Sequence, residues 1–197
     1  MNTLFLLSAF IFSLTALSVP VQAQTKKTYP IVQQQTTSTT KDTTTKDVAM
    51  KQKVEYQLPF PGILPDHPLY MVKALRDRIL EFLIVEPVRK TEFYLLQADK
   101  RLGMGAQLLD KGNTALAETT LSKGKTYMDK AVSTIVNYKA GGKEVPGYLV
   151  DRLTRSLAKH GEVLEELVAR ASETTKPALS GVLDTVKKLQ LELEKIK

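Results

Sequence analysis

Apolar and small residues recur at intervals of three and four from residue 88 to the end of the chain, and this period constrains the fold more than any other feature. Such spacing places each series on one face of an α-helix. No stretch shows the alternating, β-branched pattern that is typical of a strand. The four series are Val88, Thr91, Leu95, Ala98, Leu102, Gly105 and Leu109; Ala117, Leu121, Gly124, Met128, Ala131, Ile135 and Tyr138; Val150, Leu153, Leu157, His160, Leu164, Leu167 and Ala171; and Leu179, Val182, Val186, Leu189, Leu193 and Ile196. The sequence therefore predicts an all-α fold.

Glycine and proline mark the ends of the predicted helices. Pro87 opens one helix, and Gly112–Asn113 ends it and starts the next with almost no loop, which implies an antiparallel hairpin. Gly141–Gly142 and Lys176–Pro177 separate the helices that follow. We expect an antiparallel bundle of about five helices over residues 59–197.

The first helix of this bundle is expected over about His67 to Val85. Asp66 stands where an N-cap belongs, and Pro68 falls in the first turn, where its missing N–H does no harm. One stripe of this helix is apolar; it consists of Val72, Leu75, Ile79 and Phe82.

The second and third helices carry small residues within their stripes, which indicates that their backbones approach closely. These small residues are Ala98, Gly105, Gly124 and Ala131. The second helix also has apolar residues away from its main stripe, at Phe93, Leu96 and Leu108. We favour contact with flanking helices for these three, and the alternative is an exposed patch used for a partner or for dimerisation.

The first 23 residues resemble a secretory signal peptide. Leu4 to Val19 is an apolar run without a charge, and Val21-Gln22-Ala23 has the small or aliphatic residues of a cleavage site. The run is shorter than the roughly 20 residues that a spanning helix prefers. The alternative is an uncleaved N-terminal membrane anchor. Both interpretations predict an extracytoplasmic protein, secreted or held in the cell envelope, and the second predicts a membrane tether.

Residues 24–58 read as a disordered tether rich in Thr and Lys. The segment has almost nothing to bury, so it cannot offset the entropy of ordering its backbone. A plain spacer is the favoured interpretation, and an O-glycosylated stalk is the alternative. The net charge of +7 divides into +3 from residues 24–60 and +4 from residues 61–197, where 22 basic residues are mixed with 18 acids. This even mixture makes nucleic-acid binding an unfavoured function.

The side chains that could carry catalysis do not form a recognisable motif. Asp66 and His67 are adjacent, and adjacent residues on a helix do not face each other. His160 occupies a core-facing position without a carboxylate on its own helical face, which favours a buried, hydrogen-bonded histidine. Ser156 and Ser180 lack the turn that exposes a nucleophile. We therefore expect a protein without catalytic activity.

Cofactor and metal sites are likewise not predicted. The chain has no Cys, and no Glu-x-x-His or His-Glu-x-x-His spacing occurs. Met71, Met104 and Met128 are far apart in the sequence and fit a core role better than a soft-metal site.

Two stretches carry a resemblance to a known family. They are Ile63-Leu64-Pro65-Asp66-His67-Pro68-Leu69-Tyr70, with Lys73 a turn later, and Glu86-Pro87-Val88-Arg89-Lys90 before Leu95 and Ala98. The chain resembles a family of exported bacterial proteins that is classed only as a domain of unknown function, with a Leu-Pro-x-x-Pro-Leu-Tyr lead-in and a helical hairpin. The likeness covers about residues 58–140. It implies a bacterial envelope setting and a helical module, and it transfers no catalytic residue.

These observations favour a non-enzymatic interaction or structural module of the cell envelope, displayed on a tether, whose partner is a protein or another envelope component. A peripheral binder of anionic membrane or wall polymer is the first alternative, because of the basic excess. A metal-stress or chaperone-like helical protein is the second alternative, and an enzyme with an unfamiliar site is the third.

Overall fold

The computed structural model describes residues 53–196, so the predicted signal segment and most of the predicted tether lie outside the described residues. The described chain forms five helices and no strand, which confirms the predicted all-α fold. The helices are α1 (Tyr70–Leu83), α2 (Pro87–Asp110), α3 (Thr114–Ala140), α4 (Gly147–Arg170) and α5 (Lys176–Glu194). None of these helices has the length and apolarity needed to cross a membrane.

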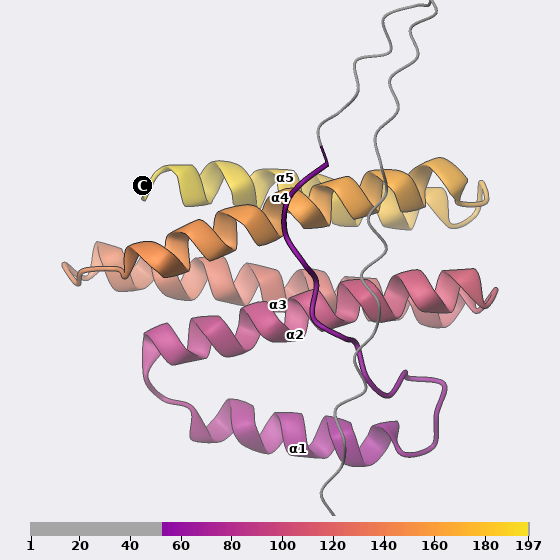
Figure 1. Cartoon of the computed structure of the whole chain (residues 1–197), viewed down its shortest axis with the longest axis horizontal. Helices are drawn as coiled ribbons and strands as arrows, with labels where there is room; N and C mark the ends of the chain where they lie inside the picture. The colour runs from indigo at the N-terminus through magenta and orange to yellow at the C-terminus, as the bar shows by residue number, and fades with distance from the viewer. Residues whose placement is uncertain (1–52, 197) are drawn as a thin grey trace, which may run out of the picture. The chain divides into compact units, whose positions relative to one another are not determined.

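Helices α2 to α5 form the core of the molecule as two stacked hairpins (Figure 1). Helix α2 packs along α3, and α4 packs along α5. The second hairpin rests on the first through contacts of α4 with α2 and of α5 with α3. Consecutive helices run antiparallel. Buried Leu, Val, Ile and Met side chains from all four helices fill the space between them.

Glycines allow α2 and α3 to pack closely, as their sequences predict. A Cβ on Gly105 would lie 2.3 Å from Cγ of Leu121 in α3, so only hydrogen fits there. A Cβ on Gly124 would lie 3.1 Å from Cβ of Arg101 in α2. Ala98 and Ala131 are fully buried in the same region. The predicted close approach of the two backbones is confirmed.

The predicted helix ends are confirmed except at α1. Gly112 has a φ of 76°, the left-handed conformation that ends α2 and reverses the chain. Helix α2 begins at Pro87, and the carboxylate of Glu86 caps it by accepting from the N–H groups of Val88 and Arg89.

The N-cap predicted at Asp66 is wrong. Helix α1 begins only at Tyr70, and its N-cap residue, Leu69, provides no side-chain acceptor. Asp66 forms an ion pair with Lys111 instead, at 2.9 Å between Oδ2 and Nζ. The prolines on either side of Asp66 explain the late start, because each disfavours the helical conformation in the residue before it.

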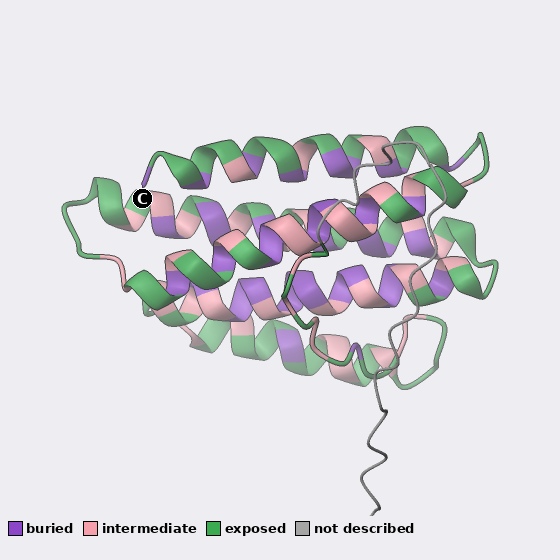
Figure 2. Cartoon of the chain, turned by 45° about the horizontal axis from the view of Figure 1, so that its top comes forward, coloured by how far each residue is buried: buried purple, intermediate pink, exposed green. Residues whose placement is uncertain are grey.

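The apolar stripe that the sequence shows on α1 faces away from the core. Val72, Leu75, Ile79 and Phe82 are all exposed, and Asp77 is the buried residue of this helix. In Figure 2, α1 lies at the bottom of the view and is mostly green, with little purple. The 3.6-residue period identified one apolar face correctly, but that face points away from α2 and α3.

Residues 53–65 form a lead-in segment that crosses α4 and α2 before α1 begins (Figure 1). The backbone N–H of Val54 donates to Oε2 of Glu162 at 2.6 Å, and the hydroxyl of Tyr56 donates to Oδ2 of Asp99 at 2.7 Å. Pro61 is buried close to Gly103 of α2. The folded region therefore begins before Leu58, the residue at which the predicted tether ends.

Candidate functional site

The largest group of exposed apolar side chains surrounds α1. Of the large hydrophobic side chains that are exposed in the described chain, all but Tyr148 and Leu191 lie between Phe60 and Val85. We call the helical part of this group the α1 surface. It consists of the N-cap residue Leu69 together with Met71, Val72, Leu75, Ile79, Leu80, Phe82 and Leu83. Val72 is 67% exposed and Phe82 is 82% exposed, so these side chains make few contacts with the rest of the fold.

The opposite face of α1 is polar and faces the bundle. Lys73, Asp77 and Glu81 follow each other at four-residue intervals, so they lie on one side of the helix. Nζ of Lys73 donates to the carbonyl oxygens of Pro61 and Ile63, at 3.3 and 3.5 Å. Asp77 is only 5% exposed and accepts from the guanidinium of Arg76 at 2.7 Å.

Glu81 joins α1 to α3. Its carboxylate accepts from Nζ of Lys130 at 2.7 Å and from the hydroxyl of Tyr127 at 3.3 Å. Lys130 also lies 5.2 Å from the ring centre of Tyr94, and Arg101 lies 4.3 Å from the ring centre of Tyr127. Helix α1 is thus joined to α3 by the polar contacts of Glu81, whereas α2 to α5 pack mainly through buried apolar side chains.

The titratable side chains beneath α1 are partly buried, and this burial contributes to the shifts of their pKa values. Burial lowers the pKa of Lys73, and the nearby Asp77 carboxylate opposes the shift. Burial alone would raise the pKa of Glu81, but the hydrogen bond and charge of Lys130 outweigh it, so the pKa is lowered. Burial raises the pKa of Tyr127.

A hollow of about 530 Å³ continues the α1 surface toward the lead-in segment. Its apolar lining includes Phe60, Ile63, Leu69 and Val72, and its charged lining consists of Lys73, Arg76 and Lys100. No acidic side chain of the described residues lines it. The hollow therefore combines apolar side chains with positive charge.

A buried polar cluster surrounds Asp99 in the middle of α2. Oδ1 of this carboxylate accepts from the hydroxyl of Ser156 at 2.6 Å and from Nε2 of His160 at 2.9 Å. Oδ2 accepts from the hydroxyl of Tyr56. Burial raises the pKa of Tyr56 to about 12, and the hydrogen bond to Asp99 adds to the shift. His160 is thus the buried, hydrogen-bonded histidine that the sequence favoured.

The Asp99 cluster differs from a catalytic triad although it contains Ser, His and Asp. In a triad the serine donates to the histidine, which in turn contacts the carboxylate. Here Ser156 and His160 both donate to the same oxygen of Asp99. All three residues are buried, so a substrate cannot reach the serine. The cluster is suited to joining α2, α4 and the lead-in segment.

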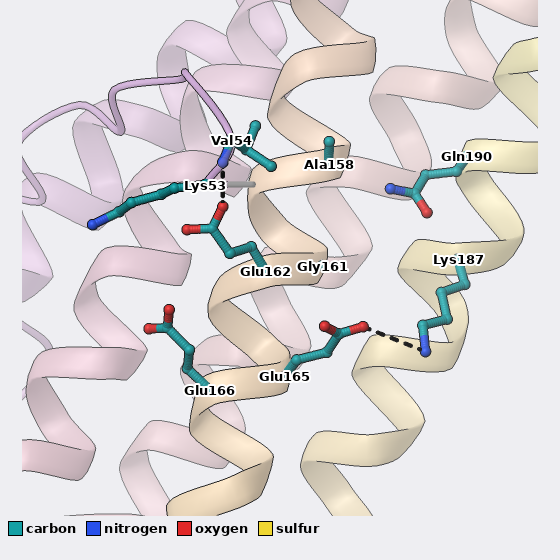
Figure 3. Close-up of a pocket in the computed structure, with 9 residues that line it drawn as sticks. All are labelled: Lys53, Val54, Ala158, Gly161, Glu162, Glu165, Glu166, Lys187 and Gln190. Atoms are coloured by element: carbon teal, nitrogen blue, oxygen red, sulfur yellow. Dashed lines mark hydrogen bonds and ion pairs between the residues drawn. The ribbon is translucent and has the colours of Figure 1, made fainter. Parts of the chain in front are cut away.

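A second hollow of about 530 Å³ lies between α4, α5 and the start of the lead-in segment (Figure 3). Its charged residues include Glu162, Glu165, Glu166 and Lys187. Lys187 forms an ion pair with Glu165 at 3.7 Å, and Glu162 accepts from the backbone of the lead-in segment. These carboxylates do not converge, and no three His, Cys, Asp or Glu side chains of the described residues are grouped as metal ligands.

The structure separates the other residues that the sequence singled out. Phe93 and Leu108 are buried and Leu96 is partly buried, so these three do not form an exposed patch, and the intramolecular interpretation describes them. Nδ1 of His67 accepts from the backbone N–H of Leu69, away from the carboxylate of Asp66.

The methionines divide between core and surface. Met104 and Met128 are fully buried, but Met71 is 75% exposed on the α1 surface, so the predicted core role is wrong for Met71.

A signal for the α1 surface existed in the sequence, because Lys73, Asp77 and Glu81 form a charged stripe opposite the apolar one. The period alone does not show whether the apolar stripe or the charged stripe of α1 packs against the bundle.

The structure defines an all-α helical domain whose first helix turns its polar face to the bundle, with no group of metal-ligating side chains among its described residues. Residues 62–174, more than half of the chain, match the family described as Domain of unknown function (DUF5667), and the chain belongs to this family. The match includes α4, which the resemblance in the sequence did not reach, and it ends before α5. Comparison with curated proteins gave no match, and comparison with solved structures gave none either.

Proposed function

We propose that this chain is a non-enzymatic interaction module of the cell envelope, and that the α1 surface is where its partner binds. The inverted polarity of α1 is the observation that supports this proposal. An amphipathic helix in a single domain normally turns its apolar stripe to the core. Here Asp77 is buried while Leu75 and Phe82 are exposed.

The energetic argument concerns the apolar area that remains in water. Full burial of a Leu, Ile, Val or Phe side chain is worth roughly 1.5–3 kcal/mol. The isolated domain leaves at least four such side chains of α1 exposed on one stripe. A partner that covers them gains this free energy, and contiguous exposed apolar patches of this kind mark interaction sites.

Site-specific photocrosslinking tests this proposal. A photoreactive phenylalanine analogue at position 82 on α1 is compared with the same analogue at position 191 on α5. Leu191 is a matched control, since it is 67% exposed and lies outside the α1 region. With envelope fractions of the host, we expect crosslinks from position 82 that position 191 does not give. Equal crosslinking from both positions would contradict the proposal.

A triple variant, V72Q/L75Q/I79Q, completes the test. These side chains are exposed, so we expect the far-ultraviolet circular dichroism and the unfolding midpoint to stay close to those of the wild type. The crosslinks from position 82 should disappear. Loss of helicity would instead mean that these side chains stabilise the fold.

Export is the sequence-based part of the proposal and needs its own measurement. Leu4 to Val19 and the Val21-Gln22-Ala23 site predict translocation and cleavage after Ala23. N-terminal sequencing of the protein from host envelope or medium should give Gln24 as its first residue. An intact N-terminus in a membrane fraction would support the anchor alternative, and recovery in the cytoplasm would contradict export.

A further inference from the structure

We infer that the partner of the α1 surface is the surface of an anionic lipid membrane. This inference rests on the proposed function, because it names the occupant of the same surface. A helix that lies in a membrane interface has an apolar stripe, a polar opposite face and basic residues at the boundary. Each of these features is present in α1.

The basic residues of α1 lie at the two edges of its apolar stripe. At 3.6 residues per turn, Arg76 lies on one side of the stripe and Arg78 lies on the other. Both are exposed. The guanidinium of Arg76 is held by Asp77, whereas Arg78 has no ion pair with any described residue. Arg78 can therefore rest its methylene groups on apolar surface while its charge reaches lipid phosphates.

The acidic residues of α1 are turned away from this surface. Asp77 and Glu81 face the bundle, where Arg76 and Lys130 pair with them. The next acid along the chain, Glu86, uses both carboxylate oxygens to cap α2. The α1 surface therefore presents positive charge without exposed carboxylates on the same helix, and an anionic surface complements it.

The hollow beside α1 extends the same chemistry. Phe60, Ile63 and Val72 provide apolar walls, and Lys100 adds a positive charge to the lining. Among the described residues, no ion pair involves Lys100 or Arg78. The acyl chains of an anionic lipid match the apolar walls of the hollow, and its phosphate matches the positive charge of Lys100.

A membrane surface fits better than a second copy of this chain. A two-fold dimer through α1 would bring each surface against its own equivalent. The basic residues Arg76, Arg78 and Lys100 would then face like charges, which is costly across an interface. With 14 residues, α1 is about 21 Å long, too short to span a bilayer but long enough to lie in its interface.

Single tryptophans provide the test, because the natural chain contains no Trp. The full chain is prepared as F82W and, separately, as L191W, the control on α5. Each variant is mixed with vesicles of phosphatidylcholine alone or of phosphatidylcholine with phosphatidylglycerol. We expect the emission of F82W to shift to shorter wavelength and to be quenched by brominated lipid, only when phosphatidylglycerol is present. The emission of L191W should not change.

Tryptophan emission reports only the surroundings of position 82 or 191. The test is therefore independent of the N-terminal apolar segment, which both variants share. A second change, R78E/K100E in the F82W background, reverses two positive charges. We expect the affinity for anionic vesicles to fall by roughly a hundredfold, since each basic residue near such a surface changes the affinity by several-fold. Circular dichroism checks that this variant remains folded.

The outcomes separate this inference from the proposed function. If F82W emission does not respond to vesicles but shifts on addition of host envelope proteins, or with its own concentration, the lipid inference is overturned and the interaction module stands. If the emission of F82W stays that of an exposed indole under every condition, both are overturned. An equal response of F82W and L191W would also overturn the inference, because it would not be specific to α1.

Discussion

At the scale of single residues, Asp99 is the buried polar group that joins α2 to α4 and to the lead-in segment. It is fully buried, and its carboxylate accepts hydrogen bonds from Tyr56, Ser156 and His160. A buried carboxylate is costly unless it is well hydrogen-bonded, and here three donors offset that cost. The cluster therefore fixes the position of α4 and the lead-in segment on α2.

Removing this carboxylate should destabilise the domain strongly. Asp99→Ala leaves the three donors without their acceptor in the interior, and an unsatisfied buried group costs about 1–3 kcal/mol. We expect the free energy of unfolding, measured by urea titration, to fall by roughly 2–5 kcal/mol. Asp151→Ala is the control, since Asp151 pairs with Arg155 on the surface, where such pairs contribute about 1 kcal/mol or less. Similar losses in the two variants would contradict a structural role for the cluster.

Tyr56 gives the cluster a signature at high pH. Its pKa in the folded protein is raised to about 12 from an ordinary value near 10. The folded state therefore holds the phenol proton more tightly than the unfolded chain does. The resulting stabilisation is complete below pH 10 and is lost as the pH rises toward 12.

Two measurements check this expectation. In a spectrophotometric titration of tyrosine ionisation, the difference between the wild type and Tyr56→Phe should show a phenol that ionises near pH 12. In denaturation experiments at successive pH values, the stability lost between pH 10 and 12 should be smaller in Tyr56→Phe. A titration of Tyr56 near pH 10 would mean that its contact with Asp99 does not form.

At the scale of helices, the contact between α2 and α3 depends on residues that lack bulk. Gly105→Ala would place a methyl group 2.3 Å from the side chain of Leu121, which must move. We expect a loss of roughly 1–3 kcal/mol in unfolding free energy, typical of an overpacked core. Gly181→Ala in α5 is the matched control, because its Cβ would meet nothing within 4 Å. That change should stabilise the protein by about 0.5–1 kcal/mol through helix propensity, and a stabilising effect of both changes would disprove the close contact.

The sequence predicted four of the helical faces correctly because a period of 3.6 residues usually identifies the side of a helix that packs. Leu95, Leu121, Leu157 and Val186 are all buried as expected. For α1 the same rule failed, since the period shows that a helix has two unlike faces but not which one meets the bundle. The carboxylate that accepts from His160 was likewise out of reach, because Asp99 lies 61 residues away on another helix.

At the scale of the whole molecule, the domain consists of two parts with different kinds of packing. Helices α2 to α5 share a continuous apolar core, to which no residue of α1 contributes. Helix α1 is attached through Lys73, Glu81 and their partners, which lie partly in contact with water. Partly exposed ion pairs contribute little to stability, whereas apolar burial contributes much. Opening of α1 alone should therefore require less free energy than unfolding of the bundle.

Amide hydrogen exchange measured by mass spectrometry should resolve these two parts. Peptides from Tyr70–Leu83 are expected to exchange well before peptides from the middle of α2, because a segment with little apolar burial opens locally. Glu81→Gln should speed exchange in α1 further and leave α2 unchanged, since it weakens the attachment to Lys130 without touching the core. If α1 and α2 exchanged together at the rate of global unfolding, α1 would be an integral part of the bundle. Its exposed stripe would then be a rigid surface, and covering that stripe would not need to order the helix first.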